Sequence, residues 1–266
     1  MKYPVANKEL GQHFLRDQKV IQAITQDFKD MAELIVEVGP GPGVLTQGLS
    51  KHELPFYVIE KDERFPEILK EHLPLENIFL EDALKFNWEH FLKKEDVQNK
   101  KIWLVSNLPY NISAPLLMQF MRIPEIKFMT LMFQKEVGEK TYYRQHEKNQ
   151  MSSLLALGQT YFKTKMLCKV MPGAFSPPPK VDSVVVSYER RETPEIPFNE
   201  FIPYELFLRH IFSQKRKQLG SVLKSLMTQE QLAILWEKSQ VLPTVRAEGL
   251  SLAEVQKLFL CYRGLI

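Results

Sequence analysis

Short runs of consecutive apolar residues alternate, over the first 190 residues, with stretches in which apolar residues recur every three or four positions. Short apolar runs bounded by polar or turn residues are typical of buried strands, and the longer spacing is typical of amphipathic helices. The pattern predicts strands at 34–38, 56–59, 78–80, 102–105 and 128–133. Strands that alternate with helices predict an α/β fold with a mostly parallel sheet and right-handed crossovers.

The intervening helical patterns include 63–72, 114–121 and 150–159. Two further strand candidates, 161–170 and 183–188, are separated by a stretch rich in glycine and proline at 173–179. We therefore expect a hairpin that closes one edge of the sheet. Before the first strand, residues 1–16 form a basic arm without regular periodicity.

The composition changes near Arg190, where three prolines and several acids within 190–203 interrupt the periodicity. Such a segment is typical of a linker. Only helical patterns follow it, at 204–213, 216–227, 229–238 and 251–260. The predicted organisation is an arm and an α/β domain over 1–190, a linker over 191–203, and a small all-helical domain over 204–266.

Composition narrows the class of protein only a little. The chain has 266 residues, of which 44% are hydrophobic and 25% charged, as in ordinary globular proteins. No apolar run approaches the ~20 residues that span a bilayer, and two cysteines make neither a disulfide framework nor a metal cluster. We expect a cytoplasmic protein that binds no metal and no membrane.

The most informative polar segment is Asn107-Leu108-Pro109-Tyr110, which follows the predicted strand at 102–105. Ligands of open α/β sheets bind at the carboxyl ends of the strands. There the Asn107 carbonyl oxygen can accept a hydrogen bond from an amine, Pro109 fixes the turn, and Tyr110 offers a flat face to a base. The segment predicts an enzyme that acts on the exocyclic amine of a planar base, although a strand end with a packing tyrosine is the alternative.

Candidate cofactor residues follow the other strands. Glycines 39, 41 and 43 follow the first strand, but their spacing matches neither a dinucleotide fingerprint nor a triphosphate loop, and Pro40 and Pro42 remove N–H donors. Glu60 lies at the offset where an acid binds ribose hydroxyls, and Asp82 could accept a hydrogen bond from an adenine amine. Each alone also fits a tight turn, a charged strand exit or a helix cap. Together they predict a nucleoside site without a pyrophosphate, which S-adenosylmethionine fits.

These segments resemble the ribosomal RNA adenine dimethyltransferases, and most closely the bacterial enzymes that act on the small-subunit (16S) RNA. The resemblance covers nearly the whole chain and is carried by 11–15, 36–46, 58–62, 81–83, 107–113, 175–186 and 212–217. It implies a Rossmann-like S-adenosylmethionine-dependent methyltransferase sheet with a small C-terminal helical domain. The implied activity is dimethylation of the exocyclic amines of two adjacent adenosines near the 3′ end of small-subunit ribosomal RNA, in an assembling 30S particle. We expect S-adenosylhomocysteine as the product and a monomeric enzyme.

The resemblance also implies roles for single residues. Gln12, His13 and Leu15 would cover the methionine end of the cofactor, and the backbone of Gly39 and Gly41 would approach it. Glu60 would bind its ribose and Asp82 its adenine, while Asn107 also lies beside the cofactor. Asn107 and the Leu108 carbonyl would hold the target amine, and Tyr110 and Phe175 would sandwich the target base. The family usually has Asn where this chain has His13, and Phe175 could instead pack in the core.

Basic residues predict the RNA contact. Five of them and no acid lie between Arg209 and Lys224, and Leu219, Val222, Leu223 and Leu226 follow the triplet Lys215-Arg216-Lys217 at helical spacing. A helix that buries one face and presents cations on the other suits a phosphate backbone. We expect Arg209, Lys215, Arg216 and Lys217 to bind RNA, although a solvated helix face is the alternative.

Three other functions compete with this interpretation. A related enzyme of large-subunit RNA would share the cofactor residues, but 175–181 and 212–217 favour the small-subunit enzyme. A DNA-adenine or protein-glutamine methyltransferase would use a similar tetrapeptide, but Leu108 occupies a position that is usually proline there. A non-catalytic assembly or transcription factor is disfavoured because Glu60, Asp82, Asn107 and Tyr110 are all present.

Overall fold

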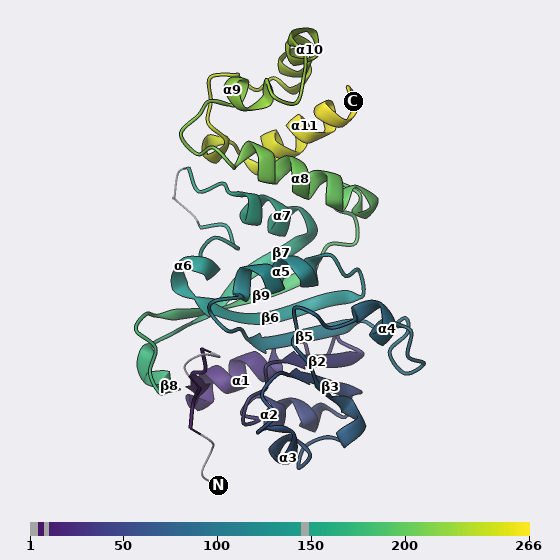
Figure 1. The fold of residues 1–266 in the computed structure, drawn as a ribbon, viewed down its shortest axis with the longest axis vertical. Helices are drawn as coiled ribbons and strands as arrows, with labels where there is room; N and C mark the ends of the chain where they lie inside the picture. The colour runs from purple at the N-terminus through teal and green to yellow at the C-terminus, as the bar shows by residue number, and fades with distance from the viewer. Residues whose placement is uncertain (1–4, 8–10, 145–148) are drawn as a thin grey trace. The chain divides into compact units, whose positions relative to one another are not determined.

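The computed structural model describes residues 5–7, 11–144 and 149–266 (Figure 1). Parts of the predicted basic arm, residues 1–4 and 8–10, therefore lie outside the described residues. The chain divides into two compact units, one of residues 1–139 and 165–190 and one of residues 140–164 and 191–266.

The sheet of the first unit has the predicted parallel centre. Its strands run in the order β4-β3-β2-β5-β6-β9-β7 (Figure 1). The five strands from β4 to β6 in this order are parallel to one another, whereas β9 is antiparallel to β6. The bounds are β2 Leu34–Val38, β3 Phe56–Glu60, β4 Ile78–Leu80, β5 Ile102–Asn107, β6 Ile126–Gln134, β7 Phe162–Val170 and β9 Ser183–Arg190. The predicted hairpin of β7 and β9 closes one edge, so the α/β prediction is confirmed.

The central strands are continuous apolar runs because helices cover both faces of a parallel sheet. One face packs α1 (Gln18–Gln26) and α2 (Thr46–Leu49) in a core that includes Ile24, Leu49 and Trp103. The other face packs α4 (Trp88–Leu92) and α5 (Ser113–Met121), where rings of Trp88 and Phe120 meet edge to face. The predicted helix at 63–72 is shorter, since α3 spans only Pro66–Leu69 between turns.

A second, two-stranded sheet joins the arm to the loop between β7 and β9. Strand β1 (Phe14–Leu15) is antiparallel to β8 (Phe175–Ser176), with Leu15 opposite Phe175. Helix α1 begins after Asp17, whose carboxylate accepts hydrogen bonds from the N–H groups of Lys19 and Val20. The arm is thus fixed at residues 14–17 by a ladder and a helix cap.

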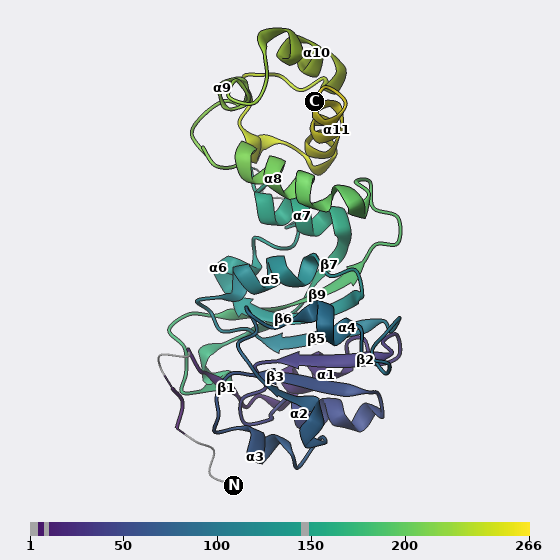
Figure 2. The same ribbon diagram turned by 45° about the vertical axis from the view of Figure 1, so that its right-hand side comes forward.

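The second unit is helical, as predicted, and its elements are labelled in Figure 2. Helix α7 packs against α8 and α11, which groups residues 140–164 with this unit rather than with residues 1–139. The segment predicted to be a linker, 191–203, already contains the start of α8. The bounds are α7 Ser153–Tyr161, α8 Phe201–Ile211, α9 Leu219–Leu223, α10 Gln229–Ser239 and α11 Leu252–Arg263; the short α6, Lys135–Gly138, lies between β6 and α7 along the chain.

The predicted helix at 216–227 is wrong at both ends, because α9 spans only Leu219–Leu223. Residues 213–218 form a turn, and α9 begins only at Leu219. All six residues from Ser213 to Gln218 are exposed, so a helix there would bury no apolar face. Because packing of such a face supplies most of the stability of a short helix, the polar segment forms the connection between α8 and α9.

Candidate active site

A cavity of about 210 Å³ lies in the first unit, at the carboxyl ends of the parallel strands. Its lining brings together ten of the eleven residues predicted to bind the cofactor or the target base: Gln12, His13, Leu15, Gly39, Gly41, Glu60, Asp82, Asn107, Leu108 and Tyr110. These residues come from positions 12 to 110 of the chain. They converge because parallel strands all end at the same edge of the sheet.

The glycine turn after β2 leaves backbone open toward this cavity. Gly39 and Gly41 have φ of 68° and 55°, a left-handed conformation that favours glycine. A Cβ atom built on Gly39 would meet nothing within 4 Å, whereas one on Gly41 would lie 3.4 Å from the Phe14 ring. A ligand can therefore approach the backbone at Gly39 closely.

Glu60 ends β3 as a buried carboxylate held by backbone donors. Its Oε1 accepts hydrogen bonds from the N–H groups of Lys61 and Asp62, and its Oε2 accepts one from Gly41, each at 2.8 Å. Burial raises the pKa of this carboxyl group, and the three backbone N–H groups oppose that rise. An ionised carboxylate has about four lone-pair sites, so Glu60 can still accept a hydroxyl donor such as that of a ribose.

Asp82 is part of a turn after β4. Its Oδ1 accepts a hydrogen bond from the N–H of Leu84 at 3.0 Å, and its Oδ2 lies 2.9 Å from Nζ of Lys61. The hydrogen bond from Lys61 lowers the pKa of Asp82. The aspartate is therefore an ionised acceptor at the rim of the cavity, which suits an amine donor.

Asn107, the last residue of β5, has its side chain oriented by the arm. Its Nδ2 donates a hydrogen bond to the carbonyl oxygen of His13 at 3.0 Å. That bond uses the amide nitrogen and leaves Oδ1 as the acceptor. The following Leu108 is buried, and its N–H donates to the Met132 carbonyl of β6. The segment is thus a rigid continuation of the sheet edge.

Tyr110 is anchored at its hydroxyl group, which lies 2.8 Å from Oγ of Ser183 at the start of β9. Burial raises the pKa of the Tyr110 phenol, so the group stays protonated. The ring of His13 stacks on the Tyr110 ring with centroids 5.6 Å apart and planes at 25°. The tyrosine therefore presents a face that already accommodates a flat ring.

His13 links three parts of the site, which sequence reasoning did not predict. Its carbonyl orients Asn107, its ring stacks on Tyr110, and its Nδ1 donates a hydrogen bond to the Pro177 carbonyl at 2.8 Å. The prediction that His13 covers the methionine end of a cofactor stays a prediction. The His13 ring stacks on Tyr110, the residue on which a target base is also expected to stack.

Phe175 is the predicted site residue that the structure does not bring to the cavity. It is only 4% exposed and packs in the core with Leu15, its neighbour in the β1–β8 ladder. Phe175 is not among the residues that line this cavity. The Phe175 ring thus packs in the core, which was the alternative interpretation, while Pro177 and Pro178 after it are exposed and Pro179 is buried. The base-stacking role stays a prediction.

Comparisons with known proteins identify the family. The model of the family "Ribosomal RNA adenine dimethylase" matches residues 5–263. The chain belongs to this family. A relative named ribosomal RNA small subunit methyltransferase A from Clostridium botulinum is 35% identical over 261 residues, which covers 96% of this chain and 93% of the relative. A relative of the same name from Clostridium perfringens is 36% identical over 256 residues, which covers 93% of this chain and 87% of the relative.

Solved structures agree with the fold of this dimethylase. A dimethyladenosine transferase from Plasmodium falciparum has a TM-score of 0.73 at 25% identity, with 95% of this chain and 98% of that chain covered. The 23S rRNA methyltransferase ErmE has a TM-score of 0.69 at 23% identity, with 93% of this chain and 98% of that chain covered. The chain is therefore an S-adenosylmethionine-dependent ribosomal RNA adenine dimethyltransferase with a Rossmann-like sheet.

The cavity of the dimethylase fits S-adenosylmethionine by the chemistry of its donors and acceptors. Open backbone at Gly39, an acceptor at Glu60 and an acceptor at Asp82 match a nucleoside with hydroxyl and amine donors and no phosphate. Within the described ranges, no three His, Cys, Asp or Glu side chains gather to hold a metal ion. The expectation that the enzyme uses no metal stays a prediction.

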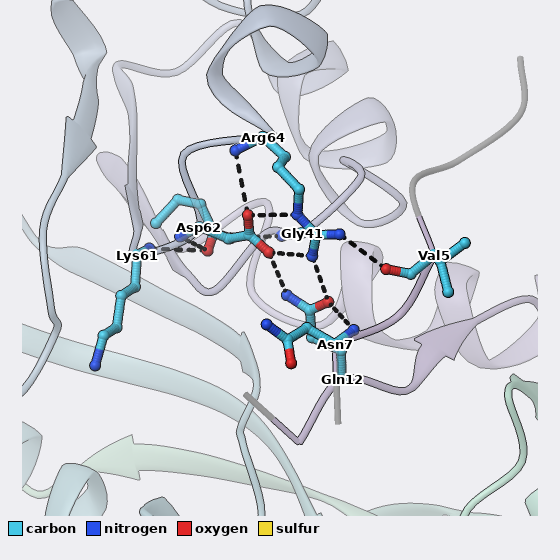
Figure 3. Close-up of polar contacts among 8 residues, drawn as sticks. Val5, Asn7, Gln12, Gly41, Lys61, Asp62 and Arg64 are labelled. Atoms are coloured by element: carbon cyan, nitrogen blue, oxygen red, sulfur yellow. Dashed lines mark hydrogen bonds and ion pairs between the residues drawn. The ribbon is translucent and has the colours of Figure 1, made fainter. Parts of the chain in front are cut away.

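A polar network that sequence reasoning missed ties the arm of the dimethylase to the turn after β3 (Figure 3). Arg64 donates to the Val5 carbonyl at 2.9 Å and to Oδ1 of Asp62 at 2.8 Å, and Gln12 donates to Oδ2 of Asp62 at 2.8 Å. Hydrogen bonds from Arg64 hold the pKa of Asp62 at about 2. The only signal in the sequence is an acid and an arginine two residues apart after a strand, which does not reveal the arm as their partner.

The predicted RNA-binding residues of the dimethylase differ among themselves. Arg209, in α8, pairs at 2.8 Å with Glu205, whose side chain is only 3% exposed. Lys215, Arg216 and Lys217 lie in the exposed turn 213–218, and none of them contacts an acid within the part of the chain that is described. The turn is therefore free to meet phosphates, whereas Arg209 already neutralises a buried carboxylate. In the described residues, no helix is long and apolar enough to cross a bilayer.

Proposed function

We propose that this enzyme dimethylates two adjacent adenosines near the 3′ end of small-subunit ribosomal RNA, on an assembling 30S particle in the cytoplasm. S-adenosylmethionine is the donor and S-adenosylhomocysteine the product, and the enzyme works as a monomer. The observation that supports this most directly is the orientation of Asn107. Its amide oxygen is set free by the bond from Nδ2 to His13, in the same cavity as Glu60 and Asp82.

The cofactor would be held by the backbone of Gly39 and Gly41, by Glu60 and Asp82, and by the arm at Gln12, His13 and Leu15. When bound, it supplies an electrophilic methyl group. Glu60 suits the ribose because its carboxylate is fixed by three N–H groups and needs no reorganisation on binding. Asp82 suits the adenine amine because Lys61 keeps it ionised.

The target amine would donate hydrogen bonds to Oδ1 of Asn107 and to the carbonyl of Leu108. Accepting both N–H groups favours a pyramidal nitrogen whose lone pair no longer delocalises into the ring. In each transfer the amine attacks while it still carries its protons, two in the first transfer and one in the second, and it loses one to water afterwards, so no strong base is required. Tyr110 fits this scheme as a stacking partner rather than a base, because its phenol stays protonated.

Positioning supplies most of the rate in such a site. Base stacking on an aromatic side chain is worth roughly 1–3 kcal/mol, and holding two reactants in line converts a bimolecular step into an effectively unimolecular one. The rigid links from His13 to Asn107 and from Tyr110 to Ser183 provide that geometry.

The proposal is tested by incubating the purified protein with S-adenosylmethionine and small-subunit particles that lack the modification. Mass spectrometry of the digested RNA should show dimethyladenosine at two adjacent positions near the 3′ end. Large-subunit particles serve as the control and should stay unmodified. Modification of large-subunit RNA alone, or of neither RNA, would overturn the proposed substrate.

A further inference from the structure

A second, larger hollow of about 1,630 Å³ adjoins the cofactor cavity in the first unit. Four segments form its walls: the arm at 5–6 and 11–16, one face of α1, the segment from α2 to residue 52, and the loop 176–181. The two hollows share residues 11–15, Val44 and Tyr110. We call this hollow the α1 groove; it reaches Tyr110, whose ring is expected to stack on the target base.

The charged side chains that line the α1 groove are all positive. Arg16, Lys51 and Lys180 line it, whereas no aspartate or glutamate does so among the residues that the structure describes. All three cations are exposed and come from three separate segments. The nearest acid along the chain, Asp17, is outside the lining and accepts the backbone hydrogen bonds that begin α1.

Neutral hydrogen-bonding side chains occupy the space between these cations. Gln18, Gln22 and Gln26 lie four residues apart on α1 and so share one helix face. Gln47 of α2 and Gln134, the last residue of β6, also line the groove. A glutamine amide offers two donors and a carbonyl acceptor. Such groups match base edges and ribose 2′-hydroxyls, while isolated cations match phosphates.

We propose that the α1 groove binds the single-stranded RNA that flanks the target adenosine. This inference rests on the proposed function, because it needs RNA as the substrate. A target adenosine must leave its stack to reach the cavity, so its neighbours in the strand lie directly outside, where the α1 groove begins. Arg16, Lys51 and Lys180 contact phosphates, and the glutamines on α1 contact bases and riboses. An acidic protein of the ribosome is the other occupant that the charges permit.

The test compares two triple variants of the full-length protein. Arg16→Ala, Lys51→Ala and Lys180→Ala remove the cations of the groove. Lys70→Ala, Lys93→Ala and Lys101→Ala form the matched control, because these exposed lysines make only surface ion pairs and lie outside both hollows. Surface pairs of this kind contribute little to stability, so both proteins should fold.

Binding of a single-stranded RNA oligonucleotide that carries the target adenosines is measured at several salt concentrations. Loss of three phosphate contacts should reduce the slope of log K against log salt by about 2, with S-adenosylmethionine affinity unchanged and KM for the particle raised about tenfold. A third variant, Gln22→Ala with Gln47→Ala, should weaken binding of the oligonucleotide while its salt slope stays at the wild-type value.

The inference is overturned if the groove triple variant keeps the wild-type slope and KM, or if it loses only binding to an acidic ribosomal protein. Failure of the proposed function looks different. In that case the wild-type protein itself leaves small-subunit RNA unmodified, and oligonucleotide binding still reports on the groove.

Discussion

The cofactor cavity and the basic turn at 213–218 are both polar. The cavity was expected to bind the cofactor and the target base, and the turn was expected to bind the RNA backbone, yet the two regions are built in opposite ways. In the cavity, Glu60, Asp82 and Asn107 each use part of their hydrogen-bonding capacity on the protein itself. In the turn, three cations project from exposed backbone and contact no acid among the described residues.

The difference follows from the ligands. A small nucleoside and a reacting amine must be held in one geometry, so the groups that hold them are fixed before binding. A polyanion is attracted by charge, and much of its affinity comes from released counterions. The cavity therefore depends on rigid neighbours, and the turn depends only on the number of its cations.

The strongest test of a rigid site is Asn107→Ala. Methyl transfer should fall by about 100-fold or more, as for a reacting group misplaced by about 1 Å, while S-adenosylmethionine affinity changes little. Turnover and cofactor binding are measured separately, with Asn199→Ala, an exposed residue of the second unit, as the control. An unchanged turnover rate would contradict the proposal that Asn107 holds the target amine.

Glu60→Gln tests the ligand-binding half of the cavity. The change places an amide N–H₂ among three backbone N–H donors, so a favourable acceptor is lost. Hydrogen bonds to charged groups are worth about 1.5–3 kcal/mol, which predicts S-adenosylmethionine affinity about 10-fold to 150-fold weaker by calorimetry. The exposed Glu63→Gln is the matched control, and equal affinities of the two variants would contradict the ribose role.

The turn is tested by changing Lys215, Arg216 and Lys217 to alanine together. We expect affinity for the small-subunit particle to fall about tenfold and the salt slope to fall by about 2 to 3. Thermal stability and S-adenosylmethionine affinity should stay at wild-type values because the three side chains are exposed. Binding that is unaltered across a salt series would make the turn an ordinary solvated surface.

The smallest expected effect concerns the free energy of unfolding, which depends on the burial of Glu37 in the lining of the cavity. Burial raises the pKa of Glu37 to about 8 from its ordinary value of 4.5, and Thr46 donates a hydrogen bond to it. Between these values the folded state holds a proton that the unfolded state releases, so the free energy of unfolding should fall as pH rises from about 4.5 to about 8.

Glu37→Gln should flatten this dependence, because an amide keeps an acceptor for Thr46 without a charge. Urea unfolding at pH 5, 6.5 and 8 should show a gain in stability that is larger at pH 8 than at pH 5. The variant of the basic turn should show no such change with pH. A parallel pH dependence of Glu37→Gln and wild type would mean that another group is responsible.

Much of the site could be predicted from local patterns. The strands are buried apolar runs, and a polar residue directly after such a run must lie at the sheet edge. That argument brought Gly39, Glu60, Asp82 and Asn107 to one cavity, as the structure confirms. It could not predict the network of Arg64, Asp62 and Gln12, since those residues meet only because the arm returns to β3.

Two features of the site depended on hydrophobic burial, which is a property of the folded chain. For Phe175 the sequence left stacking on the target base and packing in the core as alternatives; its ring packs in the core beside Leu15, and the stacking role stays a prediction. The basic triplet was expected on a helix, but residues 213–218 have no apolar face to pack. Spacing in the sequence shows where a residue lies along an element, not which surface is available to cover it.

By itself, the sequence determined the order of strands and helices, the chemical groups at each strand end and the family, because these depend on periodicity and residue type along the chain. Only the tertiary structure decided that His13 stacks on Tyr110, that Asn107 presents its oxygen, and that an acid-free groove adjoins them. Those features depend on contacts between residues far apart in the chain, and such contacts exist only once the sheet has brought the arm, the strand ends and the loop after β7 together.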